Sequence, residues 1–327
     1  MLSKLLLTIL LSLPLFADWN EYKDRFIQHD GRVLDKKNGN ITHSETIGYT
    51  LYFAYRFNDD KTFDKVYHWY KNNLKKNQYG LVSWKWGKKD QHTWGILDHN
   101  NATDGDMWIA YDLLLMGQKR VDERLKSEAI SLMEAIKKHL VITYGKKRFL
   151  LPGKEGFIKQ GHIVLNPSYY RFDILKAFSV VDDTGPWKLL AQDGEWLLHQ
   201  TMFTPLKLHA DWIKLHEDLT VQPAMNMSFG YDAIRIPLNI MQSKLSTKTI
   251  LLENYKKYVK MMQEGALPLG TVALEKGSIS LYDYCYGHLA IYDKLAAKPL
   301  FADRLKKMIQ EDKDNYYAYT LYLFTTL

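Results

Sequence analysis

The feature that most constrains the fold of this chain is the recurrence of helical segments along most of its length. In several of them, apolar residues follow the 3.6-residue period that places side chains on one face of a helix. Such a face occurs in FDKVYHWYKNNL and again in SEAISLMEAIKKHL. We predict twelve helices, at about residues 19–29, 42–57, 60–74, 103–117, 121–142, 168–181, 185–203, 229–241, 247–263, 278–295, 299–311 and 315–327.

Patterns typical of strands are short and isolated, as in GLVSWKWG, RFLLPG and LKLHADWIKL. With 327 residues and 46% hydrophobic content, the chain can build one large core or two smaller ones, and no linker divides it. The sequence therefore predicts an all-α fold with short strands in its loops. Twelve helices can form an irregular bundle, a solenoid, or six hairpins closed into a double ring. The long segments 75–102 and 143–167 carry aromatic and acidic residues, which is typical of loops around a binding cleft.

The first seventeen residues, MLSKLLLTILLSLPLFA, have the order of a secretory signal: a lysine, an apolar run and a small residue at Ala17. A single membrane anchor is the alternative, but the run is shorter than the ~20 apolar residues that a span needs. We expect a signal peptide at 1–17, no membrane span after cleavage, and one domain at 18–327. The one cysteine, Cys285, cannot form an internal disulfide.

Charge and motifs exclude several classes of protein. The formal net charge is +7, or +6 without Lys4, and the basic residues are scattered, so we expect no nucleic-acid partner. The chain contains no Walker loop, no dinucleotide-binding glycine pattern, no His-Glu-x-x-His and no Gly-x-Ser-x-Gly. Its eleven histidines do not cluster at the spacing of metal ligands. We therefore expect no cofactor and no metal.

The remaining candidates for chemistry are carboxylates among aromatic residues, beginning with Glu45 in THSETIGYT. Thr42 and Glu45 have the spacing of a capping box, in which each side chain bonds a free backbone N–H at a helix start. Glu45 also shares a helical face with Gly48, Tyr49 and Tyr52. It can therefore lie along a groove lined by tyrosines, with Gly48 leaving room for a ligand. Capping and catalysis both remain open from this stretch alone.

Two further stretches carry acids near helix starts. In NNATDGDMWIAYDLLL, Thr103 is a predicted cap, and Asp104 in the first turn either complements the helix dipole or serves a site. In SFGYDAIRIPL, Asp232 and Arg235 are three apart on a predicted helix, so they form either a simple ion pair or, with Tyr231, a polar site.

Aromatic residues supply candidate platforms for sugar rings. Trp84 and Trp86 lie two apart, which places both indoles on the same side of an extended strand. Tyr169, in NPSYY, occurs at a predicted helix start. Burial in the core is the alternative for each of them. Two separated carboxylates, a third acid and several aromatic platforms are together the components of a glycosidase, which needs one acid and one base or nucleophile.

In combination, these stretches resemble glycoside hydrolase family 8. The resemblance is carried, in the family order, by THSETIGYTLYFAYRFND, FDKVYHWYKNNL, WKWGKK, NNATDGDMWIAYDLL, LLPGKEGF, NPSYY and YDAIR, over about residues 20–240. Within the family the chain is most similar to the periplasmic cellulases that accompany bacterial cellulose synthase. The resemblance implies an (α/α)6 barrel of six inner and six outer helices.

The resemblance also implies roles for individual residues. Glu45 is then the general acid, Asp232 the general base that activates water, and Asp104 a residue that holds the sugar at the cleavage point. Three further residues line that point: Tyr169, Tyr231 and Arg235. Trp84 and Trp86 are expected as platforms in the cleft. One departure concerns position 46, where the family commonly has Gly after Ser-Glu and this chain has Thr46, which we expect to narrow the cleft locally. The region 243–300 matches only loosely.

These observations lead to the expectation of a periplasmic or secreted, monomeric, inverting endo-β-1,4-glucanase. Its expected partners are a β-1,4-linked polysaccharide and a cellulose synthase complex. The alternatives are the same enzyme acting on chitosan, xylan or mixed-linkage glucan, a polysaccharide lyase, and a non-catalytic polysaccharide-binding protein.

Overall fold

A computed structural model describes residues 14–74, 76–224, 227–266, 270–274, 278–280 and 284–327. Over these residues the chain forms twelve α-helices, one at each predicted position. They are α1 (Pro14–Phe26), α2 (Ser44–Arg56), α3 (Asp60–Asn73), α4 (Thr103–Arg120), α5 (Glu123–His139), α6 (Phe172–Val181), α7 (Trp187–Gln200), α8 (Arg235–Gln242), α9 (Lys248–Gln263), α10 (Tyr286–Ala296), α11 (Ala302–Glu311) and α12 (Tyr316–Thr326).

The strands are short and pair into antiparallel ribbons and small sheets, which is more sheet than the sequence predicted. One sheet has the order β1-β2-β3 and another the order β11-β10-β7-β6. Strands β2 and β3 lie in the predicted loop 75–102, and β5, β6 and β7 lie in the predicted loop 143–167. The strands are β1 (Thr42–His43), β2 (Lys85–Lys88), β3 (Trp94–Asp98), β4 (Val141–Tyr144), β5 (Lys147–Leu150), β6 (Ile158–Lys159), β7 (His162–Leu165), β8 (Met202–Phe203), β9 (Leu208–His209), β10 (Ile213–His216), β11 (Val221–Pro223), β12 (Ser228–Phe229), β13 (Thr271–Ala273) and β14 (Ser278–Ser280).

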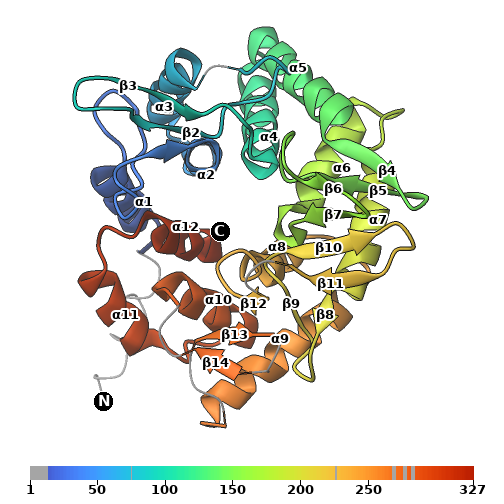
Figure 1. Ribbon diagram of the computed structural model, residues 1–327. Helices are drawn as coiled ribbons and strands as arrows, with labels where there is room; N and C mark the ends of the chain where they lie inside the picture. Colours follow the sequence, from blue (N-terminus) through green and yellow to red (C-terminus); the bar gives the residue numbers. More distant parts are fainter. Residues whose placement is uncertain (1–13, 75, 225–226, 267–269, 275–277, 281–283) are drawn as a thin grey trace, which may run out of the picture.

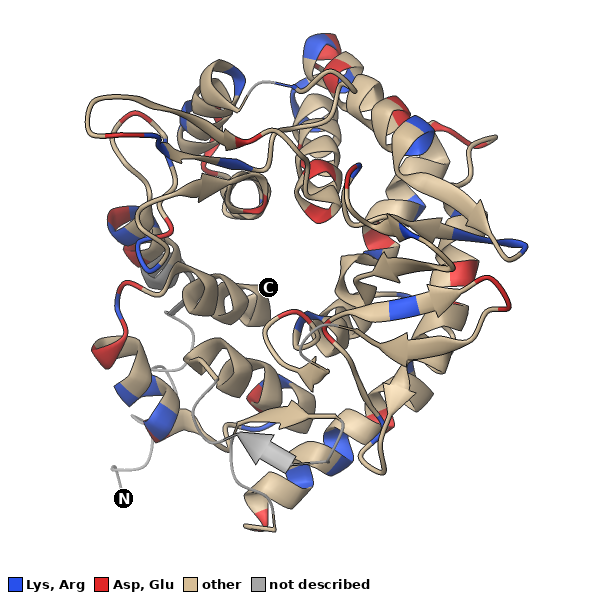
Figure 2. Ribbon diagram, viewed as in Figure 1, with Lys and Arg blue, Asp and Glu red and all other residues tan. Residues whose placement is uncertain are grey.

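The elements follow one another around a ring that closes where α1 meets α12 (Figure 1). The Tyr319 hydroxyl on α12 donates to Glu21 on α1 at 2.8 Å, and Lys36 pairs with Asp314 at 2.9 Å. Basic and acidic positions are interspersed over the ring in Figure 2, as the scattered charges in the sequence predicted. Side chains of α1 and of the segment after it thus contact α12 and the turn before it, and these contacts close the ring.

Burial alternates along the helix order. Helices α2, α4, α10 and α12 are buried over most of their length, whereas α3, α5, α7 and α9 expose a polar face and α11 has no buried residue. No helix in the described part of the chain is both long and apolar enough to cross a membrane. Of the predicted signal peptide, residues 1–13 lie outside the described residues, and α1 begins at Pro14, before the predicted cleavage site.

Three helices start four or more residues later than predicted. Helix α6 begins at Phe172 because Pro167–Tyr169 form a separate 3-10 turn, η1, with the Asn166 side chain accepting from the Ser168 N–H. The segment before Arg235 forms turns instead of the first part of α8, and Ser278–Ser280 pair as β14 ahead of α10. In each case, local turns and pairing replace the first turns of the expected helix.

The predicted caps at two helix starts are wrong. Helix α2 is capped at His43, and the Thr46 hydroxyl accepts the His43 N–H at 2.9 Å; Thr42 instead donates to the Val33 carbonyl at 2.7 Å. Helix α4 has Ala102 at its N-cap, and the hydroxyl of Thr103 donates to the Leu151 carbonyl at 2.6 Å. Glu45 is therefore not a capping residue.

Helices α2 and α4 approach each other closely through two glycines. A Cβ atom at Gly48 would lie 2.5 Å from the Trp108 Cβ, and one at Gly105 would lie 2.2 Å from the Ser44 Oγ. Real Cβ atoms essentially never come this close to another atom, so only glycine fits at either position. The prediction that Gly48 leaves room for a ligand is wrong, because Trp108 occupies that side of α2.

We predict that Gly48→Ala lowers the free energy of unfolding by about 1–3 kcal/mol, because the added methyl overpacks the contact with Trp108. Helix propensity alone predicts the opposite sign, a gain of about 1 kcal/mol. Urea denaturation compared with Lys306→Ala, on the exposed face of α11, measures the difference. A Gly48→Ala protein as stable as the wild type would show that the two helices do not depend on this contact.

Candidate active site

Six of the predicted site residues line one cleft of about 390 Å³. They come from α2, η1, and the turns and first residue of α8, and they are Glu45, Tyr49, Tyr169, Tyr231, Asp232 and Arg235. The remaining walls come from the segment before α2 and from the start of α12: Asp35, Lys37, Asn38, His43, Asn315, Tyr316 and Tyr317. Residues far apart in the sequence thus meet where the ring closes.

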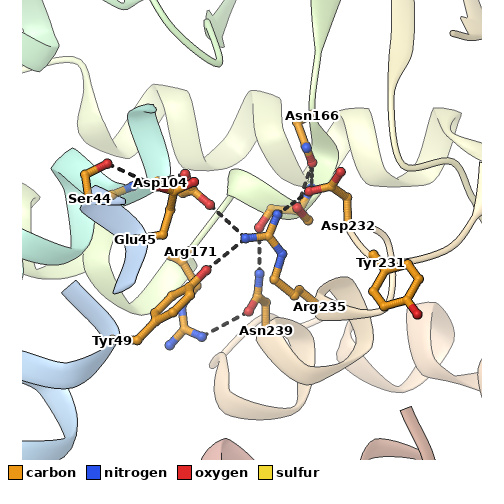
Figure 3. A network of polar contacts seen from close by, with 12 residues as sticks. Ser44, Glu45, Tyr49, Asp104, Asn166, Arg171, Tyr231, Asp232, Arg235 and Asn239 are labelled. Atoms are coloured by element: carbon orange, nitrogen blue, oxygen red, sulfur yellow. Dashed lines mark hydrogen bonds and ion pairs between the residues drawn. The ribbon is translucent and has the colours of Figure 1, made fainter. Parts of the chain in front are cut away.

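Glu45 lies in the first turn of α2, half-buried, on the wall of the cleft. Its Oε2 accepts a hydrogen bond from the Ser44 hydroxyl at 3.1 Å. Figure 3 shows its carboxylate beside that of Asp104, which projects from the start of α4. This arrangement follows from the close helix contact, because the Gly105 position lies against Ser44 and the backbone N of Glu45.

Arg235 donates hydrogen bonds to both Asp104 and Asp232. Its Nη1 donates to Asp104 Oδ2 at 2.7 Å and to the Tyr49 hydroxyl at 2.8 Å, while its Nη2 donates to Asp232 Oδ1 at 2.5 Å. The guanidinium also lies over the Tyr169 ring, 5.5 Å from its centroid. One buried cation thus holds two carboxylates in place on the two arms of its fork (Figure 3).

Burial is the main influence on the charge of Asp104, which is only 3% exposed. Burial raises the pKa of Asp104 to about 7, with a further contribution from the neighbouring charge of Glu45, and Arg235 offsets part of this increase. Burial and the nearby acids also raise the pKa of Tyr169 well above its ordinary value, so that its phenol keeps its proton. Asp104, which holds a proton near neutral pH, thus lies beside the cleft and not in its lining, whereas Tyr169 and Arg235 line the cleft itself.

Asp232 is placed by a turn, and not by the helix that the sequence predicted. Asp211 Oδ1 accepts the backbone N–H of Gly230, Asp232 and Ala233 at 3.0, 3.0 and 2.7 Å. Its other oxygen accepts from the Ser228 hydroxyl at 2.8 Å. A single buried carboxylate thus fixes the conformation of the turn that carries Asp232.

Trp212 supplies a second constraint on Asp232. Its indole Nε1 donates to Asp232 Oδ2 at 3.0 Å, and its ring stacks on Phe157 with centroids 5.9 Å apart. Both oxygens of Asp232 are therefore oriented, one by Arg235 and one by Trp212. Asp211 and Trp212 were not predicted as site residues, because HADW lies in a stretch whose only local signal is that of a strand.

The two predicted indole platforms do not line this cleft. Trp84 precedes β2, and the strand register shifts between Lys85 and Trp86, so the regular alternation behind that prediction is absent. Trp86 packs edge-on against Trp69 and stacks on Trp94 with centroids 5.5 Å apart. Asp232 and Arg235 do form the predicted ion pair.

Comparisons with known proteins identify the family. A family model described as glycosyl hydrolases family 8 matches residues 6–327. An endoglucanase from Cellulomonas uda is 32% identical over 289 residues, 88% of this chain and 79% of that protein. The crystal structure of the endoglucanase Cel10 from Klebsiella pneumoniae superposes with a TM-score of 0.82 at 30% identity, over 95% of this chain and 97% of that one. The endo-β-1,4-glucanase CMCax from Acetobacter xylinum gives a TM-score of 0.82 at 27% identity, over 95% and 96%. The chain belongs to glycoside hydrolase family 8 and is a glycoside hydrolase.

We predict that Asp104 titrates with a midpoint near 7, because burial and Glu45 disfavour its charged form. The raised pKa in the folded state means that protonation stabilises the folded protein, and that this stabilisation is lost as the pH rises from about 4 through about 7. Infrared difference spectra recorded against pH should contain a protonated-carboxyl band that disappears with this midpoint. The band should be missing from Asp104→Asn; complete ionisation of Asp104 at pH 5 would contradict the prediction.

We predict that Asp211→Ala lowers kcat with little change in KM, because the turn that carries Asp232 loses its anchor. Leaving three N–H groups, two of them buried, without this acceptor should also lower the free energy of unfolding by about 1–3 kcal/mol. Asp211→Asn keeps Oδ1 as an acceptor and should lose less activity, and Asp218→Ala, in an exposed turn, is the control. Wild-type kcat in Asp211→Ala would show that the turn does not depend on Asp211.

Proposed function

We propose that this chain is an exported, inverting endo-β-1,4-glucanase in which Glu45 is the general acid and Asp232 the general base. The observation that carries the proposal is the convergence of Glu45 and Asp232 on one cleft, with Asp104 and Arg235 between them (Figure 3). The relatives named above as endoglucanases support the β-1,4-glucan as substrate.

The contacts of each carboxyl support its role. Glu45 takes no part in capping α2 and accepts from the neighbouring Ser44, which leaves its carboxyl able to reach a glycosidic oxygen in the cleft. Arg235 and Trp212 each donate to one oxygen of Asp232, and this oriented carboxyl lines the cleft, where it can take a proton from water. An inverting enzyme needs room for that water, with its two carboxyls roughly 6.5–9.5 Å apart.

The other residues position the sugar. Asp104 lies next to Glu45 and can hydrogen-bond sugar hydroxyls, as the family resemblance implies. Tyr169 is buried against the Arg235 guanidinium, and Tyr231 is 44% exposed at the rim, where its ring can stack on a sugar. The Tyr49 hydroxyl accepts a hydrogen bond from Arg235 and so helps to hold the guanidinium in place. Trp84 and Trp86 remain predicted platforms for more distant sugars of a long chain.

The alternation of buried and half-exposed helices supports an (α/α)6 barrel with inner and outer helices. The signal-like residues 1–17 support export to the periplasm or beyond.

The resemblance to cellulases that accompany cellulose synthase supports a role in trimming cellulose as it is made, by a monomeric enzyme. Chitosan, xylan and mixed-linkage glucan remain the alternative substrates, and non-catalytic binding the alternative function.

The proposal is tested by reducing-end release from carboxymethyl cellulose, lichenan, xylan and chitosan. We predict activity on carboxymethyl cellulose, and a loss of at least ~100-fold in both Glu45→Gln and Asp232→Asn, since each removes a proton-transfer group. Glu253→Gln, on the exposed side of α9, is the control.

Folding of each variant is checked by thermal denaturation. If the enzyme acts on another of these glycans and both substitutions abolish that activity, the proposed mechanism stands and only the proposed substrate is wrong. Activity that survives both substitutions, or binding without any hydrolysis by the wild type, would contradict the proposal.

A further inference from the structure

The side chain of Asn239 is buried next to the cleft, and neither the motifs nor the family resemblance assigns it a role. It projects from α8, one turn after Arg235, and is 6% exposed. Its Oδ1 accepts from Arg171 Nη1 at 3.0 Å, a contact drawn in Figure 3, and its Nδ2 donates to the Ser168 carbonyl at 2.8 Å. Both ends of the amide are therefore bonded.

The orientation of this amide follows from its two partners. A guanidinium can only donate, so the atom that faces Arg171 is the amide oxygen. A carbonyl can only accept, so the atom that faces Ser168 is the amide nitrogen. A flipped amide would place donor against donor and acceptor against acceptor. Each end of Asn239 thus has one fixed partner.

The two partners lie on either side of Tyr169 in the chain. Ser168 directly precedes it in η1, and Arg171 follows two residues later, before α6. The peptide unit between Ser168 and Tyr169 is bonded on both sides, because its carbonyl accepts from Asn239 and its N–H donates to the Asn166 carbonyl at 3.2 Å. Since a peptide unit is planar, these two bonds fix the direction in which the chain enters Tyr169. Asn239 thus holds the chain just before and just after Tyr169.

Arg171 is itself held firmly. Its buried guanidinium donates to the two oxygens of Asp173 at 3.0 and 2.5 Å and lies over the Trp108 ring, 4.5 Å from the centroid. Burial disfavours the charged form, but the charge and hydrogen bonds of Asp173 outweigh burial, and the pKa of Arg171 is raised. Nη1 also donates to the Gln242 side chain at 2.9 Å. The oxygen of Asn239 therefore faces a cation whose position other residues set.

The ring of Tyr169 lies between the two groups that orient Asp232. It lies against the Arg235 guanidinium, 5.5 Å from its centroid, and meets the Trp212 ring edge-on with centroids 6.2 Å apart. Arg235 and Trp212 each donate to one oxygen of Asp232. Helix α8 thus carries both the guanidinium that contacts the ring and the amide that holds the backbone next to it.

Packing leaves room for movement at this point. Asn239, Ser168, Arg171 and Arg235 share the lining of a cavity of about 20 Å³. Protein interiors are otherwise close-packed, so a segment beside a cavity can shift when its hydrogen bonds are removed. The position of Tyr169 therefore depends on the contacts of Asn239 as well as on packing.

We propose that Asn239 is a positioning residue that places the Tyr169 hydroxyl among the acids of the cleft. The inference rests on the proposed function, in which Tyr169 helps to position the sugar. Burial, and then the charges of Asp104, Glu45 and Asp232, raise the pKa of the Tyr169 phenol, so it keeps its proton and can donate a hydrogen bond in the cleft. Asn239 is not among the described residues that line the cleft, so it acts through Tyr169.

Substitutions of the amide test this role. We expect Asn239→Leu to lower kcat on cellopentaose roughly tenfold with less than about twofold change in KM, because a small displacement of a positioned group lowers the rate of the chemical step. Asn239→Asp keeps an acceptor for Arg171 but, as a carboxylate, cannot donate to Ser168, and we expect a similar loss. Gln242→Ala is the matched control, since it removes the other amide that accepts from Arg171 Nη1 and leaves the Ser168 contact in place. We expect wild-type kcat in Gln242→Ala.

A double-mutant cycle separates positioning from general destabilisation. Tyr169→Phe removes the hydroxyl, so in its background we expect Asn239→Leu to lower kcat less than about twofold. Equal losses in the two backgrounds, or wild-type kcat in both Asn239 variants, would overturn the inference.

Crystal structures of the variants give a readout that does not depend on activity. We expect the Tyr169 side chain to be displaced in Asn239→Leu and unmoved in Gln242→Ala. An unmoved Tyr169 in Asn239→Leu would overturn the inference. A wild type inactive on cellopentaose would refute the proposed function, and the position of Tyr169 in these crystals would then decide whether Asn239 places it.

Discussion

The close contact between α2 and α4 is the interaction on which the site depends. Gly48 and Gly105 remove the two side-chain positions that would otherwise hold the helices apart. As a result, the first turns of both helices meet, and the half-buried Glu45 becomes a neighbour of the buried Asp104. Close packing of two helix starts thus brings together two carboxyls that repel each other when charged.

The electrostatics of the cleft follow from that contact. Burial and the charge of Glu45 raise the pKa of Asp104, and Arg235 connects Asp104 to Asp232 on the opposite side. Asp211 accepts the backbone N–H of Asp232, and the Trp212 indole donates to its carboxyl, so both residues hold Asp232 in place. In the proposed mechanism the acid, Glu45, lies beside another carboxyl and the base, Asp232, lies beside a guanidinium, and acid–base catalysis uses such a separation of environments.

Much of this arrangement could be predicted from the sequence, for physical reasons that differ between residues. The twelve helices were found because their apolar periodicity is a local property. Glu45, Asp104 and Asp232 were ambiguous as isolated residues, and it was the family motifs around them that distinguished site from cap or ion pair. Several of the short strands were predicted, but their pairing into hairpins was not, because it is decided by tertiary contacts. The roles of Asp211 and Trp212 depend on a turn that lies about twenty residues away in the sequence, and no local pattern marks them.

The most direct test of the account is the configuration of the sugar released by the wild-type enzyme. The central claim is that Asp232 activates water on the face opposite the bond that Glu45 protonates. Proton NMR of cellopentaose, recorded in the first minutes of hydrolysis before the anomers equilibrate, reports this directly. The account predicts that the new reducing ends appear first as the α-anomer. New ends that appear first as the β-anomer would mean retention of configuration, and would contradict the assigned roles of Glu45 and Asp232.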